Sequence, residues 1–174
     1  MKKGDKKGQF YLLATIIIVT IVASLVIVSN YSTEKTNIKF NHLGKELEIE
    51  SRNVIDYGIK NNENIKDLLI DFTKNYSIYS TAESLYFIFG NDDEVTISGY
   101  KKLNSEVVVI NTGSGNEDFS LNKEEYKSQS FSDPTENIKI KVGEIDYDFT
   151  LNSGENFYFI ISKEIDGEKH IFTK

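Results

Sequence analysis

The fold of this chain is decided by the stretch Phe10-Tyr-Leu-Leu-Ala-Thr-Ile-Ile-Ile-Val-Thr-Ile-Val-Ala-Ser-Leu-Val-Ile-Val28. It contains no charged residue, and as a helix rising about 1.5 Å per residue it would cover roughly the 30 Å of a bilayer core. Its hydroxyl groups, on Thr15, Thr20 and Ser24, can each bond back to a carbonyl one turn earlier in the helix. The stretch therefore predicts a membrane-spanning helix surrounded by lipid.

The residues on either side of this stretch predict its orientation. Four lysines precede it within residues 1–8, whereas Glu34 and Lys35 cancel each other on the far side. The positive-inside rule then predicts a single-pass protein of the cell membrane, with a cytoplasmic N-terminus and an extracellular C-terminal domain. A cleaved secretory signal would have a shorter apolar region before a small-x-small site, and Val28-Ser-Asn-Tyr31 is a poor site of that kind.

The junction Lys6-Lys-Gly-Gln-Phe10 is more specific than a generic membrane anchor. It resembles the class III signal peptide of archaeal type IV pilin-like proteins, in which a short basic leader ends in Gly before the apolar helix. The resemblance is limited to residues 3–30. It implies that a prepilin-type peptidase cuts between Gly8 and Gln9, and that copies of the chain self-associate through Phe10 to Val28. The alternative is a plain signal anchor whose lysines only set its orientation.

Two positions depart from the pattern of this family. Pilins of several groups place a Glu at the fifth mature position, where it can pair with a neighbouring subunit's new amino terminus, and Leu13 stands there in this chain. One archaeal group reads Gln-x-Ser-x-Glu, of which this chain keeps Gln9 but has Tyr11 in place of Ser. Without that carboxylate, register in a filament would depend on apolar packing alone, as in the flagellin-like members.

Composition narrows the classes of function. The 174 residues carry a net charge of −7, and because the leader is positive, the rest of the chain is more acidic still. Such a surface repels phosphate backbones, which argues against nucleic-acid binding. The chain has no Cys, so it has neither a disulfide framework nor a thiolate ligand or nucleophile. The part beyond the apolar run is long enough for one domain with its own core.

Two amphipathic helices are predicted after the apolar run. In the first, apolar residues recur at helical spacing; they are Phe40, Leu43, Leu47, Val54 and Tyr57. This face is covered either by the chain's own domain or by a helix of another subunit. Gly58 and the pair Asn61-Asn62 end this helix, and Asn62 or Asn64 caps the second one. The apolar side of the second helix holds Ile65, Leu68, Leu69, Phe72 and Tyr76.

From Leu85 onward, apolar residues alternate with polar ones, which is typical of strands. Strands are predicted over residues 85–89, 95–98, 106–110, 138–142, 145–151, 157–162 and 169–173, with weaker edge strands over 119–121 and 126–131. Short strands at this spacing, joined by hairpin-length turns, predict an antiparallel β-sandwich or a curled sheet. No helix is predicted between them, which argues against a βαβ nucleotide-binding fold.

The predicted fold class is therefore α+β, with a long N-terminal transmembrane helix, amphipathic helices, and an antiparallel β-sandwich or curled-sheet domain outside the cell. The predicted domains are a basic cytoplasmic leader over 1–8, a transmembrane or filament-core helix over 9–30, a helical stalk over 31–81, and an extracellular β domain over 82–174.

The sequence shows no pattern of catalytic residues. The two histidines, His42 and His170, each lack a second His or a carboxylate at ligand spacing. The turn Asp92-Asp-Glu94 gathers hard oxygens but lacks the alternating spacing that aims them at Ca²⁺, and Glu117 with Asp118 is a similar case. We therefore expect no catalytic residues, no metal site and no cofactor.

Two sequons, Asn30-Tyr-Ser32 and Asn75-Tyr-Ser77, predict glycosylation of an exported chain at Asn75 and, closer to the membrane, at Asn30.

Three functions are compatible with these patterns. The first is a pilin-like structural protein of the cell surface that forms filaments through its N-terminal helix. The second is a membrane-anchored binding module that does not polymerise. The third is a solute-binding or metal-dependent domain, which would require Asp92, Asp93, Glu117 and Asp118 to converge.

Overall fold

The computed structural model describes the backbone of residues 6–80, 82–165 and 168–174, and the side chains of residues 11, 14–24, 40–80, 82–164 and 169–174. The chain divides into two compact units, Met1–Phe40 and Asn41–Lys174. A continuous helix α1 (Lys6–Asn61) contributes to both units, and a second helix α2 (Ile65–Tyr79) belongs to the second.

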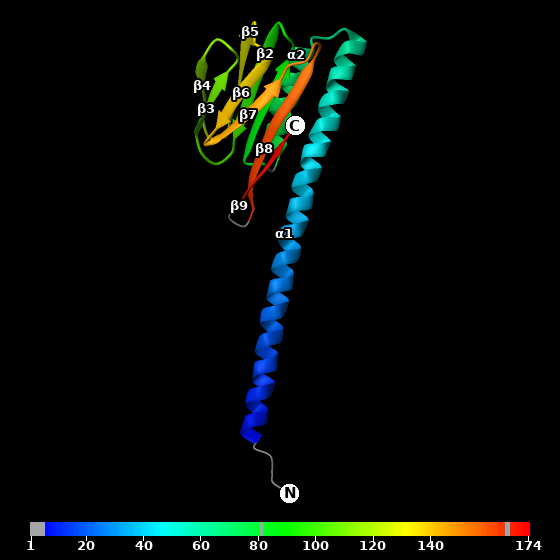
Figure 1. Ribbon diagram of the computed structural model, residues 1–174. Helices are drawn as coiled ribbons and strands as arrows, with labels where there is room; N and C mark the ends of the chain where they lie inside the picture. The colour runs from blue at the N-terminus through cyan, green and yellow to red at the C-terminus, as the bar shows by residue number, and fades with distance from the viewer. Residues whose placement is uncertain (1–5, 81, 166–167) are drawn as a thin grey trace. The chain divides into compact units, whose positions relative to one another are not determined.

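Nine strands in the described residues form two antiparallel sheets (Figure 1). The strands are β1 (Ser84–Gly90), β2 (Glu94–Lys101), β3 (Glu106–Asn111), β4 (Asn116–Leu121), β5 (Glu125–Ser132), β6 (Asn137–Val142), β7 (Ile145–Thr150), β8 (Asn156–Ile165) and β9 (Glu168–Thr173). The five-stranded sheet has the order β5-β2-β1-β8-β9, and the four-stranded sheet has the order β4-β3-β6-β7. This arrangement is compatible with the predicted β-sandwich.

The hairpin of β6 and β7 joins two strands that the sequence predicts. Lys139 lies opposite Asp148 and Lys141 lies opposite Asp146, so that lysines face aspartates on the outer side of the sheet. The alternate residues, such as Ile138 and Ile140, point into the core. The turn between the strands uses Gly143 at a positive φ of 63°, a conformation that glycine adopts without strain.

A core fills the space between the two sheets. Its buried apolar residues are Tyr86, Ile88, Val95, Ile97, Val108, Ile110, Phe119, Leu121, Phe131, Ile138, Ile140, Val142, Phe149, Leu151 and Ile160. β1 supplies Tyr86 and Ile88 to this core, and because side chains alternate along a strand, Leu85, Phe87 and Phe89 point to the other face. All three are buried as well. β1 is therefore covered on both faces, which explains why it reads as a continuous apolar run.

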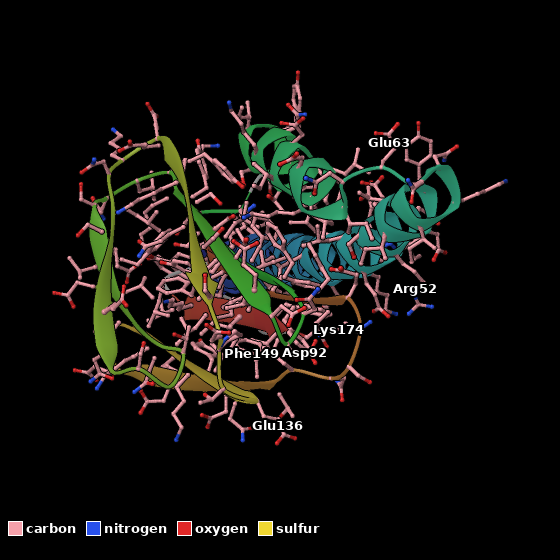
Figure 2. All side chains as sticks on the ribbon, turned by 90° about the horizontal axis from the view of Figure 1, so that it is seen from above. Arg52, Glu63, Asp92, Glu136, Phe149 and Lys174 are labelled. Carbon is pink, nitrogen blue, oxygen red and sulfur yellow. The ribbon has the colours of Figure 1, made fainter. Side chains whose placement is uncertain are left out.

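The helices cover this second face of the five-stranded sheet. Figure 2 shows α2 and residues 41–61 of α1 together on one side of the sheets. Phe72 of α2 contacts Phe157 of β8, with ring centroids 6.3 Å apart, and Phe157 stacks on Phe89 of β1. Leu47 of α1 is fully buried. The helices of residues 41–79 thus share a compact unit with the sheets.

The ends of the two helices lie where the sequence predicts them. α1 ends at Asn61, and Asn62 follows with a positive φ of 55°, which is common at helix C-termini. The Glu63 amide then donates to the Gly58 carbonyl at 3.0 Å. At the start of α2, the Asn64 side chain accepts a hydrogen bond from the Asp67 amide at 3.3 Å, so of the two predicted caps, Asn62 and Asn64, it is Asn64 that caps the helix.

Gly44 lies on α1 where the helix meets β9. A Cβ at this position would lie 2.6 Å from Cδ1 of Phe172, whose ring is stacked on Phe159 at 5.8 Å. Alanine in a helix is favoured over glycine by about 1 kcal/mol. Because the ring contact opposes that gain, we expect Gly44→Ala to lower the free energy of unfolding by about 1 kcal/mol.

The same substitution should have the opposite effect once the ring is removed. In a Phe172→Ala background, we expect Gly44→Ala to raise the free energy of unfolding by about 1 kcal/mol, measured by urea denaturation of all four chains in a double-mutant cycle. An equal effect of Gly44→Ala in both backgrounds would show that the ring does not restrict position 44.

The predicted membrane-spanning helix over residues 9–30 is wrong, and so are the fold class that includes it and the localisation in the cell membrane. Among the described residues, no helix combines the length and the apolar content needed to cross a bilayer. α1 continues beyond the apolar run into charged sequence as far as Asn61.

Candidate functional site

The N-terminal unit presents a continuous apolar surface on α1. Its large side chains are between 51% and 60% exposed; they are Ile16, Ile17, Ile18, Val19, Ile21 and Val22. Successive residues of a helix are turned by about 100°, so Ile16 to Val19 alone point to all sides of the helix. Exposed patches of this kind mark interaction surfaces. We call residues 14–24 the apolar segment.

The hydroxyl groups of the apolar segment bond within their own helix, as the sequence predicts. Thr15 donates to the Tyr11 carbonyl at 2.9 Å, Thr20 to the Ile16 carbonyl at 2.8 Å, and Ser24 to the Thr20 carbonyl at 2.8 Å. These bonds satisfy the hydroxyl donors locally, so a partner that packs on this surface does not have to supply acceptors for them.

The predicted processing and glycosylation residues lie on helices. Gly8, Gln9 and Asn30 belong to the backbone of α1, and their side chains lie outside the described residues. Asn75 is exposed on α2, but Ser77 of the same sequon is buried and donates to the Thr73 carbonyl at 2.7 Å. Cleavage at Gly8 and glycosylation at Asn75 and Asn30 stay predictions.

The acidic residues singled out in the sequence lie apart on the surface. Asp92 and Asp93 form an exposed turn in which the Asn91 side chain accepts from the Asp93 and Glu94 amides at 3.0 and 3.1 Å. Glu94 pairs with Lys66 at 2.6 Å, and Glu117 accepts a hydrogen bond from Gln129 at 3.3 Å. Within the described residues, no three His, Asp or Glu side chains are placed to hold a metal ion.

The two histidines are also separate. His42 is exposed on α1, whereas His170 is half-buried on β9, where Lys163 lies opposite it.

A groove of about 420 Å³ runs between α1 and α2 in the second unit. It is lined by Leu43, Glu46, Glu50, Phe72, Asn75, Tyr76, Tyr79 and Ser80. The Tyr76 hydroxyl donates to the Leu43 carbonyl at 3.0 Å, which ties the two helices together along the groove. We call this the interhelical groove. The sequence patterns do not predict this groove, although Glu46 and Glu50, four residues apart, indicate one acidic face on the first helix.

The interhelical groove is negatively charged, because its charged lining residues are Glu46 and Glu50. Burial raises the pKa of the Tyr76 hydroxyl, and the negative charges of Glu46 and Glu50 raise it further. Tyr76 therefore keeps its hydroxyl proton, which it donates to the Leu43 carbonyl.

A second cavity, of about 450 Å³, lies beside the start of α2. Its lining is mainly polar and includes the ion pair of Lys66 and Glu94. Burial raises the pKa of Glu155 in this cavity, and a hydrogen bond with Asn91 lowers that pKa by a smaller amount. The lining carries both signs of charge, with Lys66 beside several carboxylates.

Among the described residues, the most enclosed ion pair joins Lys101 of β2 to Glu106 of β3. Lys101 Nζ and the Tyr86 hydroxyl both lie 2.5 Å from Glu106 Oε2, and the Lys101 and Glu106 side chains are only 15% and 19% exposed. Burial alone would raise the pKa of Glu106, but the hydrogen bonds from Lys101 and Tyr86 outweigh it and lower the pKa. We call these three residues the Glu106 cluster and assign it to stability.

In comparisons with known proteins, no family model, no curated protein and no solved structure matches this chain.

Proposed function

We propose that this chain is a structural subunit that assembles with copies of itself through the apolar segment of α1. The observation that carries the proposal is the exposure of Ile16 to Val22 on all sides of one helix. A helix that is apolar all round is stable only when it is surrounded. Copies of the same helix supply such surroundings without any other component.

The energy available for this assembly is large. Complete burial of one Ile or Val side chain contributes roughly 1.5–3 kcal/mol, and six such side chains in each copy are more than half exposed. A single partner helix covers only one side of another helix, so a pair would leave much of this surface in water. We therefore expect each helix to have several neighbours in the assembly.

The N-terminal sequence supports this proposal from another direction. The resemblance of residues 3–30 to pilin-like proteins implies self-association through Phe10 to Val28. Leu13 stands where many pilins carry a Glu, so here the register between copies would come from side-chain packing. Hydroxyl groups bonded within the helix are suited to such packing.

The proposal is tested by two double variants of the full chain. Ile17→Asp with Ile21→Asp places two charges in the apolar segment. Leu103→Asp with Val107→Asp is the matched control, because these residues are 51% and 55% exposed in the second unit. In sedimentation velocity, we expect the parent chain and the control to form large assemblies and the Ile17/Ile21 variant to sediment as a monomer.

Electron microscopy of the same samples distinguishes ordered assemblies of constant width from amorphous aggregates. A parent chain that stays monomeric at high concentration, or a control variant that dissociates as fully as the Ile17/Ile21 variant, would reject the proposal. The first of these results would favour the alternative of a binding module that does not polymerise.

A further inference from the structure

The interhelical groove combines two kinds of side chain that the proposed assembly does not use. Leu43, Phe72, Tyr76 and Tyr79 give it apolar and aromatic walls, and Glu46 and Glu50 add two carboxylates. Glu46 and Glu50 are one turn apart on α1, so both lie on the same side of the groove. Of the described residues, those that line the groove include no Lys or Arg.

The aromatic residues of the groove are placed by the fold. The rings of Phe72 and Tyr76 contact each other at 5.9 Å, and the Tyr76 hydroxyl is held by the Leu43 carbonyl. Tyr79 is 85% exposed at the end of α2, which is unusual for so large a ring. An aromatic ring attracts a cation to its face, and the attraction increases when a nearby carboxylate adds to it.

The shape of the groove indicates whether such a cation is a small free ligand or the end of a side chain. Sites for small free ligands usually enclose most of the ligand, whereas this groove is open to solvent along the helices. Lysine and arginine have an apolar stem and a charged head. Leu43 and Phe72 match the stem, and Glu46 with Glu50 matches the head.

We propose that the interhelical groove binds a lysine or arginine side chain of a partner polypeptide. The stem packs between Leu43 and Phe72, and the charged group lies between the two carboxylates and the ring of Tyr79. This proposal does not depend on assembly through the apolar segment, which lies in the other unit.

The test uses the full chain and a capped, fluorescently labelled peptide in which one lysine is flanked by leucines. The matched peptide has norleucine in place of lysine, which keeps the stem and removes the charge. We expect the lysine peptide to bind at least tenfold more tightly in fluorescence anisotropy, and its advantage to shrink as salt is added.

Variants of the chain locate the binding. Glu46→Gln with Glu50→Gln should weaken binding of the lysine peptide by about tenfold. Asp92→Asn with Asp93→Asn removes the same charge from an exposed turn and should change binding by less than about twofold. Circular dichroism of each variant verifies that it is folded.

Three results would overturn the proposal. One is equal binding of the lysine and norleucine peptides, and another is equal weakening by the two double variants. The third is no peptide binding, together with a lower sedimentation coefficient for the Glu46/Glu50 variant. This last result would show that a second copy of the chain fills the groove. The Ile17/Ile21 variant is predicted to bind the peptide as tightly as the parent chain does. A result against the proposed assembly is therefore distinguishable from a result against peptide binding.

Discussion

Replacing Phe87 by alanine is expected to lower the free energy of unfolding by about 3–5 kcal/mol. Phe87 is fully buried on the helix-facing side of β1, with its ring 6.1 Å from that of Phe157. Phe157 in turn contacts Phe72 of α2. Removing the Phe87 ring leaves a cavity between the sheet and the helices, and the surrounding backbone can fill it only in part.

This prediction is measured by urea denaturation, with circular dichroism followed at wavelengths that report helix and strand. Leu103→Ala is the control, because Leu103 is 51% exposed and should change the free energy of unfolding by less than about 0.5 kcal/mol. Both wavelengths should give the same midpoint for the Phe87 variant. A loss below about 1 kcal/mol, or a separate transition for the helices, would show that they are not part of one cooperative unit with the sheet.

Glu106→Gln should lower the free energy of unfolding by about 2 kcal/mol at neutral pH. The substitution removes the charge that Lys101 and the Tyr86 hydroxyl both bind at 2.5 Å. Lys101 then keeps its own charge in a position that is only 15% exposed. Leaving one member of an enclosed ion pair without its partner is costly, because neither water nor protein replaces the lost interaction.

The effect of Glu106→Gln should depend on pH with a definite sign. The pKa of Glu106 is lower in the folded chain than in the unfolded chain. A lowered carboxyl pKa gives stability that is present above the unfolded pKa, roughly 4.3, and that is lost as the pH falls through the folded pKa. The difference between parent and variant should therefore be full at pH 7 and should shrink in acid.

The control for this prediction is the exposed pair of Lys139 and Asp148, whose side chains are 68% and 66% exposed and 3.6 Å apart. Asp148→Asn should change the free energy of unfolding by less than about 1 kcal/mol, because water screens exposed pairs. If the two substitutions had equal effects, or if the effect of Glu106→Gln did not change with pH, the Glu106 cluster would not contribute as described.

Local patterns in the sequence predicted much of the second unit. The alternation of Ile138 and Ile140 with Lys139 and Lys141 determines which face of β6 is buried, and the structure confirms it. The cap at Asn64 was predictable as well, since it depends on residues within one helical turn. Such features can be predicted because they depend only on residues that are close together in the sequence.

Long-range features could not be predicted in this way. The Glu106 cluster brings together β1, β2 and β3, and no spacing in the sequence indicates that Tyr86 meets Glu106. The interhelical groove likewise depends on how α1 and α2 pack. The membrane-spanning prediction used an apolar window alone, and among the described residues no helix has both the length and the apolar content needed to cross a bilayer.

Residues 41–61 of α1 and strand β9 come from opposite ends of the second unit's sequence, yet they meet. A Cβ on Gly44 would touch Phe172, and Glu48 forms an ion pair with Lys174. During translation the ribosome releases the helix well before it releases the strand, so this face of the helix has no native partner until synthesis of β9 is complete. Contacts so distant in sequence slow folding and leave apolar surface open to chaperones. The docking of this face of the helix therefore waits for the last strand of the sheet.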